Sequence, residues 1–206
     1  PISISAEMAK VRDYVPDYAV MAHRGSTFWA PEETESAWRW AREMGADYLE
    51  SDLQCTKDGV ILANHDDNLK RTTNIENVYS ELVPATRKAF YMRHGVSEEE
   101  AEKLVAADKA SFRPYYAMSY MYEELLALDA GSWFNETSIE QARKSFAEKH
   151  QYVSALEDQI RYAEGKMLKR GSDGERIYTV TGTWDPDKPR DCLTYKFEYV
   201  DDPQDT

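Results

Sequence analysis

The fold is decided by one stretch of the sequence, residues 18–66: YAVMAHRGSTFWAPEETESAWRWAREMGADYLESDLQCTKDGVILANHD. Its apolar run at 18–22 indicates a buried strand that stops at a polar turn. Residues 31–44 indicate a helix, because glutamates stand near its start and a glycine follows its end. Residues 46–52 and 60–63 indicate two further strands. Strand, helix and strand at this spacing predict an α/β fold with parallel strands joined by a crossover.

Polar side chains stand at the end of each of these three predicted strands. His23 and Arg24 follow the first, Glu50 and Asp52 end the second, and His65 follows the third. Because active sites in parallel α/β folds form at the carboxyl edge of the strands, we expect these side chains to meet. Two carboxylates two residues apart on a strand share a face and suit an oxygen-seeking cation such as Mg²⁺ or Ca²⁺. Two histidines supply an acid and a base near neutral pH, and an arginine fork matches a phosphate.

Each of these signals is weak when it is taken alone. A single histidine at a strand end is more often an ordinary surface or core residue, and an E-x-D pair is common on solvated strand ends. Three such signals at one predicted edge favour a functional site. We interpret the two other histidines, His94 and His150, as solvated, and the aromatic residues Phe28, Trp29 and Trp133 as packing residues.

The rest of the chain predicts helices followed by a β-hairpin. Residues 81–119 indicate a helical hairpin, and residues 122–128 indicate a further short helix. Residues 138–170 are charged, with apolar residues at helical spacing, which predicts more helix. Two alternating segments within residues 176–200 flank the turn sequence DPDKPRD, and this pattern is typical of a β-hairpin.

Composition narrows the classes of protein to which the chain could belong. The 206 residues include 38 Asp and Glu against 25 Lys and Arg, a formal net charge of −13. This balance argues against a nucleic-acid-binding protein and against adhesion to an anionic membrane face. No apolar run approaches the roughly 20 residues of a membrane-spanning helix. The two cysteines, Cys55 and Cys192, form neither a disulfide framework nor a C-x-x-C zinc or redox motif.

Six short motifs occur in order along the chain: HRG at 23–25, P-E-x-T at 31–34, E-x-D at 50–52, T-K-D-G at 56–59, HD at 65–66 and R-T-T at 71–73. With this order and spacing the sequence resembles the glycerophosphodiester phosphodiesterases, over about residues 22–74 and again at 125–135. The resemblance implies a (β/α)₈ TIM barrel. It also implies a small-molecule substrate, a glycerophosphodiester that is hydrolysed to sn-glycerol 3-phosphate and an alcohol.

The resemblance assigns roles to individual residues by their positions in these motifs. His23 and His65 match a general acid and base pair, Arg24 matches the phosphate-holding arginine, and Glu50 and Asp52 match two ligands of a divalent metal. The implied cofactor is Mg²⁺ or Ca²⁺. Glu32 matches a glutamate near the same site.

Two departures from the family pattern concern this site. Glu33 replaces the asparagine of the family's P-E-N-T motif and adds an acidic group close to an anion site. The family takes a third metal ligand, a glutamate, from a strand beyond the element that ends at Phe134. No segment after Phe134 has that pattern, and Glu198 in the predicted hairpin is the nearest candidate.

Length predicts how much of the barrel the chain holds. A (β/α)₈ barrel takes roughly 250 residues, whereas three strands are used by residue 63. We therefore expect only the N-terminal part of the barrel, with a helical insertion and a C-terminal β-hairpin insertion, as part of a longer enzyme. The expected division is 1–80 for the first barrel units, 81–119 for the helical insertion, 120–135 for a return to the barrel, and 136–206 for the second insertion.

Two other functions stay open at this point. One is a non-catalytic phosphate-ligand or interaction module, and the other is a lipid phosphodiesterase of the sphingomyelinase D type. The acidic insertions without an apolar docking helix argue against the second. The chain begins PISIS, without an initiator methionine, which together with the resemblance favours a periplasmic or secreted location over a cytoplasmic one. The oligomeric state, the metal and the preferred head group are not predicted.

Overall fold

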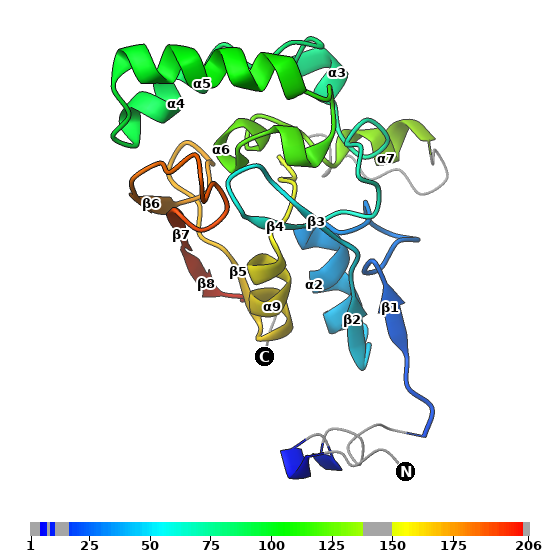
Figure 1. Ribbon diagram of the computed structural model, residues 1–206. Helices are drawn as coiled ribbons and strands as arrows, with labels where there is room; N and C mark the ends of the chain where they lie inside the picture. The colour runs from blue at the N-terminus through cyan, green and yellow to red at the C-terminus, as the bar shows by residue number, and fades with distance from the viewer. Residues whose placement is uncertain (1–4, 8, 11–16, 138–149, 204–206) are drawn as a thin grey trace.

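A computed structural model describes residues 5–7, 9–10, 17–137 and 150–203 of the chain (Figure 1). Its first unit is a strand, a helix and a strand: β1 (Met21–His23), α2 (Glu35–Glu43) and β2 (Tyr48–Glu50). β1 and β2 are parallel, with Met21 opposite Tyr48 and His23 opposite Glu50. The predicted crossover is confirmed, but the predicted burial of the run at 18–22 is wrong, because Tyr18, Val20 and Met21 are exposed.

Helix α2 begins later than the sequence pattern indicates. The hydroxyl of Thr34 caps the helix by accepting a hydrogen bond from the N–H of Ala37, which satisfies one of the donors that every helix start leaves free. The helix ends before Gly45, whose φ of +82° permits the turn that leads into β2. Residues 31–34 are therefore outside the helix, and they carry two glutamates into the site described below.

The third predicted strand pairs differently from the expectation. β3 (Leu53–Cys55) and β4 (Ile61–Ala63) form an antiparallel hairpin, and the strand at 60–63 joins no parallel sheet. The reason is the connection between β3 and β4, which is too short for a crossover, because parallel strands need a dozen or more residues between them. The turn is fixed by Gly59, with φ of +91°, and by the Thr56 hydroxyl, which accepts from the N–H of Val60.

Helices form a layer above these strands in Figure 1. The hydroxyl of Ser97 caps the longest of them by accepting a hydrogen bond from the N–H of Glu100. Two helices, α4 and α5, occupy the segment in which a helical hairpin is expected. The helices of this layer are α3 (Ile75–Val78), α4 (Arg87–Arg93), α5 (Glu98–Ser111), η1 (Ala117–Ser119), α6 (Tyr122–Leu125) and α7 (Ser132–Thr137).

The described residues from 150 to 203 contain one helix and four strands. The predicted hairpin is present, since β6 and β7 are antiparallel over five residue pairs. Residues 166–168 form a strand that pairs with β8, so the expectation of helix up to residue 170 is wrong there. The predicted segment 138–149 lies outside the described residues. The elements are α9 (Leu156–Ala163), β5 (Lys166–Leu168), β6 (Tyr178–Gly182), β7 (Leu193–Phe197) and β8 (Tyr199–Asp201).

The described residues form four two-stranded sheets and no closed barrel. The α/β class is confirmed, and the partial barrel stays a prediction. The largest apolar cluster joins β4 to the helical layer and to β7, so that the first and last parts of the chain share one core. Its most buried members are Leu62, Leu69, Ile75, Ala117, Tyr120, Tyr122, Leu125 and Leu128.

Two buried arginines tie the elements around this core together. Arg87 donates through Nε and Nη2 to the carboxylate of Glu124, at 2.9 and 2.8 Å, and through Nη1 to Asp108 at 2.6 Å. Arg176 donates through Nη1 and Nη2 to the carboxylate of Asp158, at 3.0 and 2.7 Å. Each arginine therefore joins segments that are distant in sequence.

The structure corrects the predictions about three single side chains. His94, expected to be solvated, is buried at the end of α4, where its ring lies 4.7 Å from that of Phe90. His150 is partly buried and its ring lies 4.4 Å from that of Tyr152. Phe28, expected to pack, is instead exposed.

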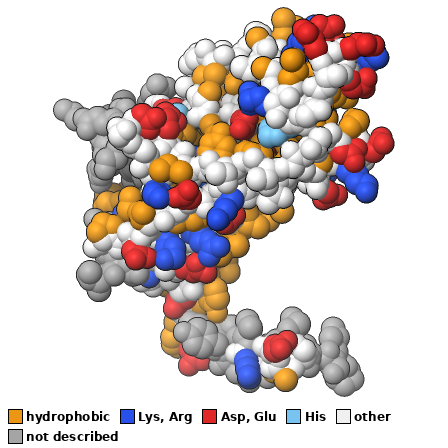
Figure 2. Space-filling model, turned by 90° about the vertical axis from the view of Figure 1, so that its left-hand side faces the viewer, with side chains coloured by type: hydrophobic (Ala, Val, Ile, Leu, Met, Phe, Trp, Pro, Cys, Tyr) orange, Lys and Arg blue, Asp and Glu red, His pale blue; other side chains and the backbone are white. Residues whose placement is uncertain are grey.

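The protein surface mixes charges of both signs. On the face shown in Figure 2, acidic and basic side chains are interspersed among uncharged and hydrophobic ones. Among the described residues, no helix has the length and apolar character needed to cross a membrane.

Candidate active site

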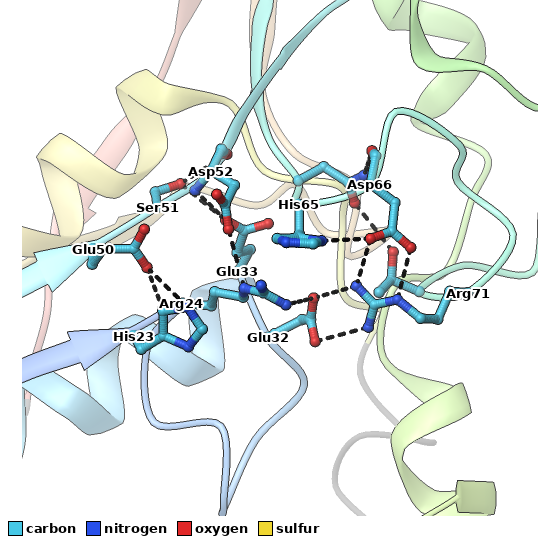
Figure 3. A network of polar contacts seen from close by, with 12 residues as sticks. His23, Arg24, Glu32, Glu33, Glu50, Ser51, Asp52, His65, Asp66 and Arg71 are labelled. Carbon is cyan, nitrogen blue, oxygen red and sulfur yellow. Dashed lines mark hydrogen bonds and ion pairs between the residues drawn. The ribbon is translucent and has the colours of Figure 1, made fainter.

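The predicted site lies where β1 and β2 end (Figure 3). His23 is the last residue of β1 and Glu50 the last residue of β2, and the parallel register sets them opposite each other. Nε2 of His23 lies 4.0 Å from Oε2 of Glu50. One possible metal-ligand atom from each of His23, Glu50 and Asp52 lies within 4.8 Å of the other two. Local strand pairing therefore places three of the predicted residues together.

Arg24 crosses the middle of this cluster. Its backbone is left-handed, with φ of +57°, and its N–H donates to Oε2 of Glu50 at 3.0 Å. Its Nε donates to Oδ2 of Asp52 at 3.1 Å, and its Nη1 donates to Oε1 of Glu32 at 3.3 Å. The predicted phosphate-binding arginine is thus held by carboxylates, which leaves Nη2 as its only guanidinium nitrogen without a hydrogen bond among the described residues.

His65 follows β4 and is fixed by the next residue in the chain. Nδ1 of His65 and Oδ1 of Asp66 are 2.6 Å apart. Hydrogen bonds from Arg71 lower the pKa of Asp66 to about 2, although partial burial opposes the shift. An ionised Asp66 only accepts hydrogen bonds, so Nδ1 of His65 carries the proton and Nε2 is left to take part in proton transfer.

Arg71 is the residue that the sequence prediction missed. Nη1 and Nη2 donate to the two oxygens of Glu32 at 3.0 and 2.7 Å, and Nε and Nη2 donate to those of Asp66 at 2.8 and 3.2 Å. These hydrogen bonds raise the pKa of Arg71 above its ordinary value. Burial alone would raise the pKa of Glu32, but Arg71 and Arg24 lower it overall. The signal was present in the R-T-T motif, which had no role assigned.

The six predicted residues therefore belong to one connected set. Arg71 joins Asp66, the partner of His65, to Glu32, and Arg24 joins Glu32 to Asp52 (Figure 3). The loop after β1, the loop after β2 and the loop after β4 all contribute side chains. The structure places the predicted residues side by side, while their individual roles stay predictions.

Glu33 has a different position from its neighbour Glu32. It is buried, its φ is +55°, and its Oε1 accepts hydrogen bonds from the N–H of Asp52 at 2.7 Å and from the hydroxyl of Ser51 at 3.2 Å. Its Oε2 is buried without a hydrogen-bond partner among the described residues. Burial, with a smaller contribution from the charge of Asp52, raises the pKa of Glu33 to about 7. Near neutral pH this residue therefore adds less negative charge than the sequence indicates.

The chemistry of the cluster suits a divalent cation. Four carboxylates, Glu32, Glu50, Asp52 and Asp66, face only two arginines, so the network has an excess of negative charge. Carboxylate oxygens are the ligands that Mg²⁺ and Ca²⁺ prefer. Glu50 and Asp52 fit such an ion as predicted, with His23 beside them.

Glu198 does not complete this cluster. Its carboxylate forms an ion pair with Nζ of Lys169 at 2.7 Å, between β5 and the junction of β7 and β8. Among the described residues, the group of possible metal ligands contains only His23, Glu50 and Asp52. The suggestion of Glu198 as the third ligand is therefore not supported.

A parallel strand pair that gathers histidine, carboxylate and arginine side chains at its carboxyl end defines an α/β protein with a connected polar cluster at the edge of the strands. Comparison with protein families identifies one family. The model of the glycerophosphoryl diester phosphodiesterase family matches residues 23–185, which contain the whole network. The chain belongs to this family.

Individual relatives match only over part of their length. A glycerophosphoinositol inositolphosphodiesterase, GDPD2 of Mus musculus, is 28% identical over 165 residues, which are 77% of this chain and 25% of that protein. A glycerophosphodiester phosphodiesterase of Bacillus subtilis is 30% identical over 126 residues, 61% of this chain and 30% of that protein. The chain thus matches less than a third of the length of either relative.

A solved structure shows a similar partial match. It is that of an Oleispira antarctica phosphodiesterase in complex with the product sn-glycerol-3-phosphate. The two chains are 22% identical with a TM-score of 0.47, over 74% of this chain and 42% of the other.

Proposed function

We propose that this chain carries the acid–base and cation-binding residues of an enzyme that hydrolyses glycerophosphodiesters to sn-glycerol 3-phosphate and an alcohol. The observation that supports the proposal most is the cluster of His23, Glu50 and Asp52, joined through Arg24, Glu32 and Arg71 to His65 in a member of this family. The substrate class comes from the family and the named relatives. The geometry supplies the residues that would carry out the reaction.

We assign one histidine as the general acid and the other as the general base. The ionised Asp66 beside Nδ1 of His65 stabilises an imidazolium, so we assign His65 the general acid that protonates the leaving alcohol. His23 is then the base, and its Nε2 accepts the proton of the attacking hydroxyl. That hydroxyl belongs to water or to the glycerol of the substrate. A new P–O bond forms as the P–O bond to the alcohol breaks, while His23 takes the proton of the attacking hydroxyl and His65 gives a proton to the leaving alcohol. Attack by the glycerol hydroxyl gives a cyclic phosphate, which water then opens to sn-glycerol 3-phosphate.

The remaining residues of the network orient the phosphate and hold charge. Glu50 and Asp52 would hold the cation, which when bound supplies positive charge that stabilises the phosphate oxygens. Nη2 of Arg24 is the guanidinium nitrogen that is left for a phosphate oxygen. Arg71 keeps Glu32 and Asp66, and through Asp66 also His65, in fixed positions.

The test is an assay of sn-glycerol 3-phosphate release from glycerophosphocholine by the full chain, with Mg²⁺, Ca²⁺ or a chelator. We expect metal-dependent turnover, and a fall of roughly 10²- to 10⁴-fold in both His23→Ala and His65→Ala. His150→Gln is the matched control, because His150 has no place in the network, and it should keep wild-type turnover. Full activity in either alanine variant, or no turnover by the folded wild type with both cations, would reject the proposal.

A further inference from the structure

A second cleft lies at the opposite end of the β3–β4 hairpin from the candidate active site. Its volume is about 240 Å³, and its charged lining residues are Lys57, Arg87, Asp108, Arg113 and Arg190. We call it the basic cleft. It is bounded by the turn between β3 and β4, by α5 with the segment that follows it, and by the turn between β6 and β7.

The charge of the basic cleft is the reverse of that of the whole protein. Four of its five charged residues are cations, in a chain whose net charge is −13. Two of these cations are already neutralised, because Arg87 binds Asp108 and Glu124, and Lys57 binds Asp108 at 2.9 Å. Arg113 and Arg190 form no ion pair with another described residue. The cleft therefore keeps two positive charges that have no acidic partner.

The side chain of Arg113 and the backbone of Arg190 each contact neighbouring segments. The guanidinium of Arg113 lies 3.8 Å from the centre of the Tyr116 ring, and its backbone N–H donates to the hydroxyl of Ser119. The backbone of Arg190 touches the β3–β4 turn so closely that a Cβ on Gly59 would lie 2.1 Å from the Arg190 carbonyl oxygen. Three segments that are distant in sequence thus bring positive charge to one cavity.

The shape and lining of the cleft indicate which kind of anion fits. Guanidinium forks match the oxygens of a phosphate and bind it with charge-assisted hydrogen bonds. The volume lies below the roughly 300–1,000 Å³ of pockets for drug-sized ligands, so the ligand is small. Phe112, Met118 and Pro189 add an apolar wall beside the charged groups. We propose that the basic cleft binds a small phosphomonoester, with Arg113 and Arg190 holding its phosphate.

This site is separate from the candidate active site. Asp52 stands before β3 and Lys57 stands after it, about 16 Å apart along an extended strand. None of the residues that line the basic cleft belongs to the network of His23, Arg24 and Arg71. Ligand binding here is therefore independent of the proposed hydrolysis, and each proposal can fail without the other.

Calorimetric titration of the full chain at low ionic strength tests the proposal, with inorganic phosphate, sn-glycerol 3-phosphate and phenyl phosphate as separate ligands. The test variant is Arg113→Gln/Arg190→Gln. The matched control is Lys109→Gln/Lys188→Gln, which removes the same charge from α5 and from the same turn without changing a lining residue. A third protein, Arg24→Gln, removes the arginine of the candidate active site. Circular dichroism checks that each variant is folded.

We expect phenyl phosphate to bind the wild type and Arg24→Gln alike. For sn-glycerol 3-phosphate, which is also the product of the proposed hydrolysis, Arg24→Gln should lose only the part of the binding that belongs to the candidate active site. We also expect the loss of both cleft arginines to weaken the binding of phenyl phosphate at least tenfold, since hydrogen bonds to charged groups are the stronger ones. The control pair should change the affinity less than twofold. Tighter binding of phenyl phosphate than of inorganic phosphate would support contact with the apolar wall. Equal weakening in the cleft and control variants, loss of binding in Arg24→Gln alone, or no binding by the wild type would overturn the proposal.

Discussion

Arg176 and Arg71 use the same hydrogen-bond geometry in two very different regions. Arg176 faces one carboxylate, Asp158, and these side chains are 1% and 0% exposed. Arg71 faces two carboxylates, Glu32 and Asp66, and its side chain is 43% exposed. Charges balance in the first region, whereas carboxylates exceed arginines in the second. Burial and charge balance, rather than the ion pair itself, therefore distinguish the Arg176 pair from the network for which we propose a cation and a substrate.

The largest effect is expected from breaking the buried network. Replacing Arg176 by methionine leaves the buried carboxyl group of Asp158 without its cationic partner, and it also removes the contact between Arg176 and the ring of Phe197. Breaking such a pair costs about 3–5 kcal/mol of stability. Urea unfolding followed by circular dichroism measures the loss.

The double variant Arg176→Met/Asp158→Asn separates the two contributions. Because it removes the buried charge together with its partner, we expect it to be more stable than Arg176→Met alone. The comparison between the regions fails if the single and double variants are equally stable, or if Arg176→Met unfolds no more easily than the wild type.

In the exposed network, the same kind of change should affect turnover and leave the fold intact. We expect Arg71→Gln to lower kcat by about 10- to 100-fold, because it releases Asp66 and Glu32, which fix His65 and Arg24. Stability should change by less than about 1 kcal/mol, as for other exposed ion pairs. Steady-state kinetics and urea unfolding of the same preparation test both statements.

Lys70→Gln is the matched control for Arg71→Gln, because Lys70 is the preceding residue and pairs with Glu76 outside the network. It should keep wild-type kcat. If Arg71→Gln raises KM and leaves kcat unchanged, Arg71 binds the substrate directly and the positioning role is wrong.

Glu33 is expected to make the stability of the protein depend on pH. Its pKa is about 7 in the folded chain against an ordinary value of 4.5, so folding favours the protonated form. The contribution of Glu33 to the free energy of unfolding is therefore complete below about pH 4.5 and is lost as the pH rises to 7. We expect Glu33→Gln, measured with a chelator present, to melt a few degrees higher than the wild type at pH 8 and about equally at pH 5. A difference that is the same at both pH values would contradict this assignment.

The smallest effect is expected where charges are exposed and belong to neither network. Lys103 on α5 pairs with Glu99 and Glu100, all of them exposed. Lys103→Gln should change the free energy of unfolding by less than about 0.5 kcal/mol, because water and salt screen such pairs. A loss comparable to that of Arg176→Met would show that burial does not separate the two classes of ion pair.

The sequence is sufficient to predict those elements whose pattern lies within a short stretch of the chain. The crossover from β1 through α2 to β2 follows from hydrophobic runs, a cap and a glycine within thirty or so residues. The register of that single strand pair then sets His23 opposite Glu50, so the centre of the site could be predicted as well. The C-terminal hairpin was predictable for the same reason, since alternation and turn residues stand side by side.

The sequence is insufficient to predict strand pairing, burial and side-chain contacts that involve segments outside a short stretch of the chain. The strand at 60–63 was assigned to a parallel sheet, although β3, immediately before it, forms its hairpin partner. The burial of His94 depends on packing against the last third of the chain, where the backbone N–H of Trp184 donates to the backbone carbonyl of His94. The position of Arg71 between Glu32 and Asp66 depends on contacts across 39 residues of sequence. No periodicity within a short window encodes these contacts.

The two-stranded sheets have a consequence for the behaviour of the chain at high concentration. Among the described residues, β1 pairs with β2 along one edge only, and Val20 and Met21 at its start are exposed apolar residues. Such an edge can template pairing with a second molecule, and only the mutual repulsion of chains carrying a net charge of −13 opposes it at long range. Salt reduces that repulsion to distances of about 10 Å at 0.1 M. Colloidal stability of this protein should therefore fall as ionic strength rises, so dilute buffer is the medium that keeps it dispersed.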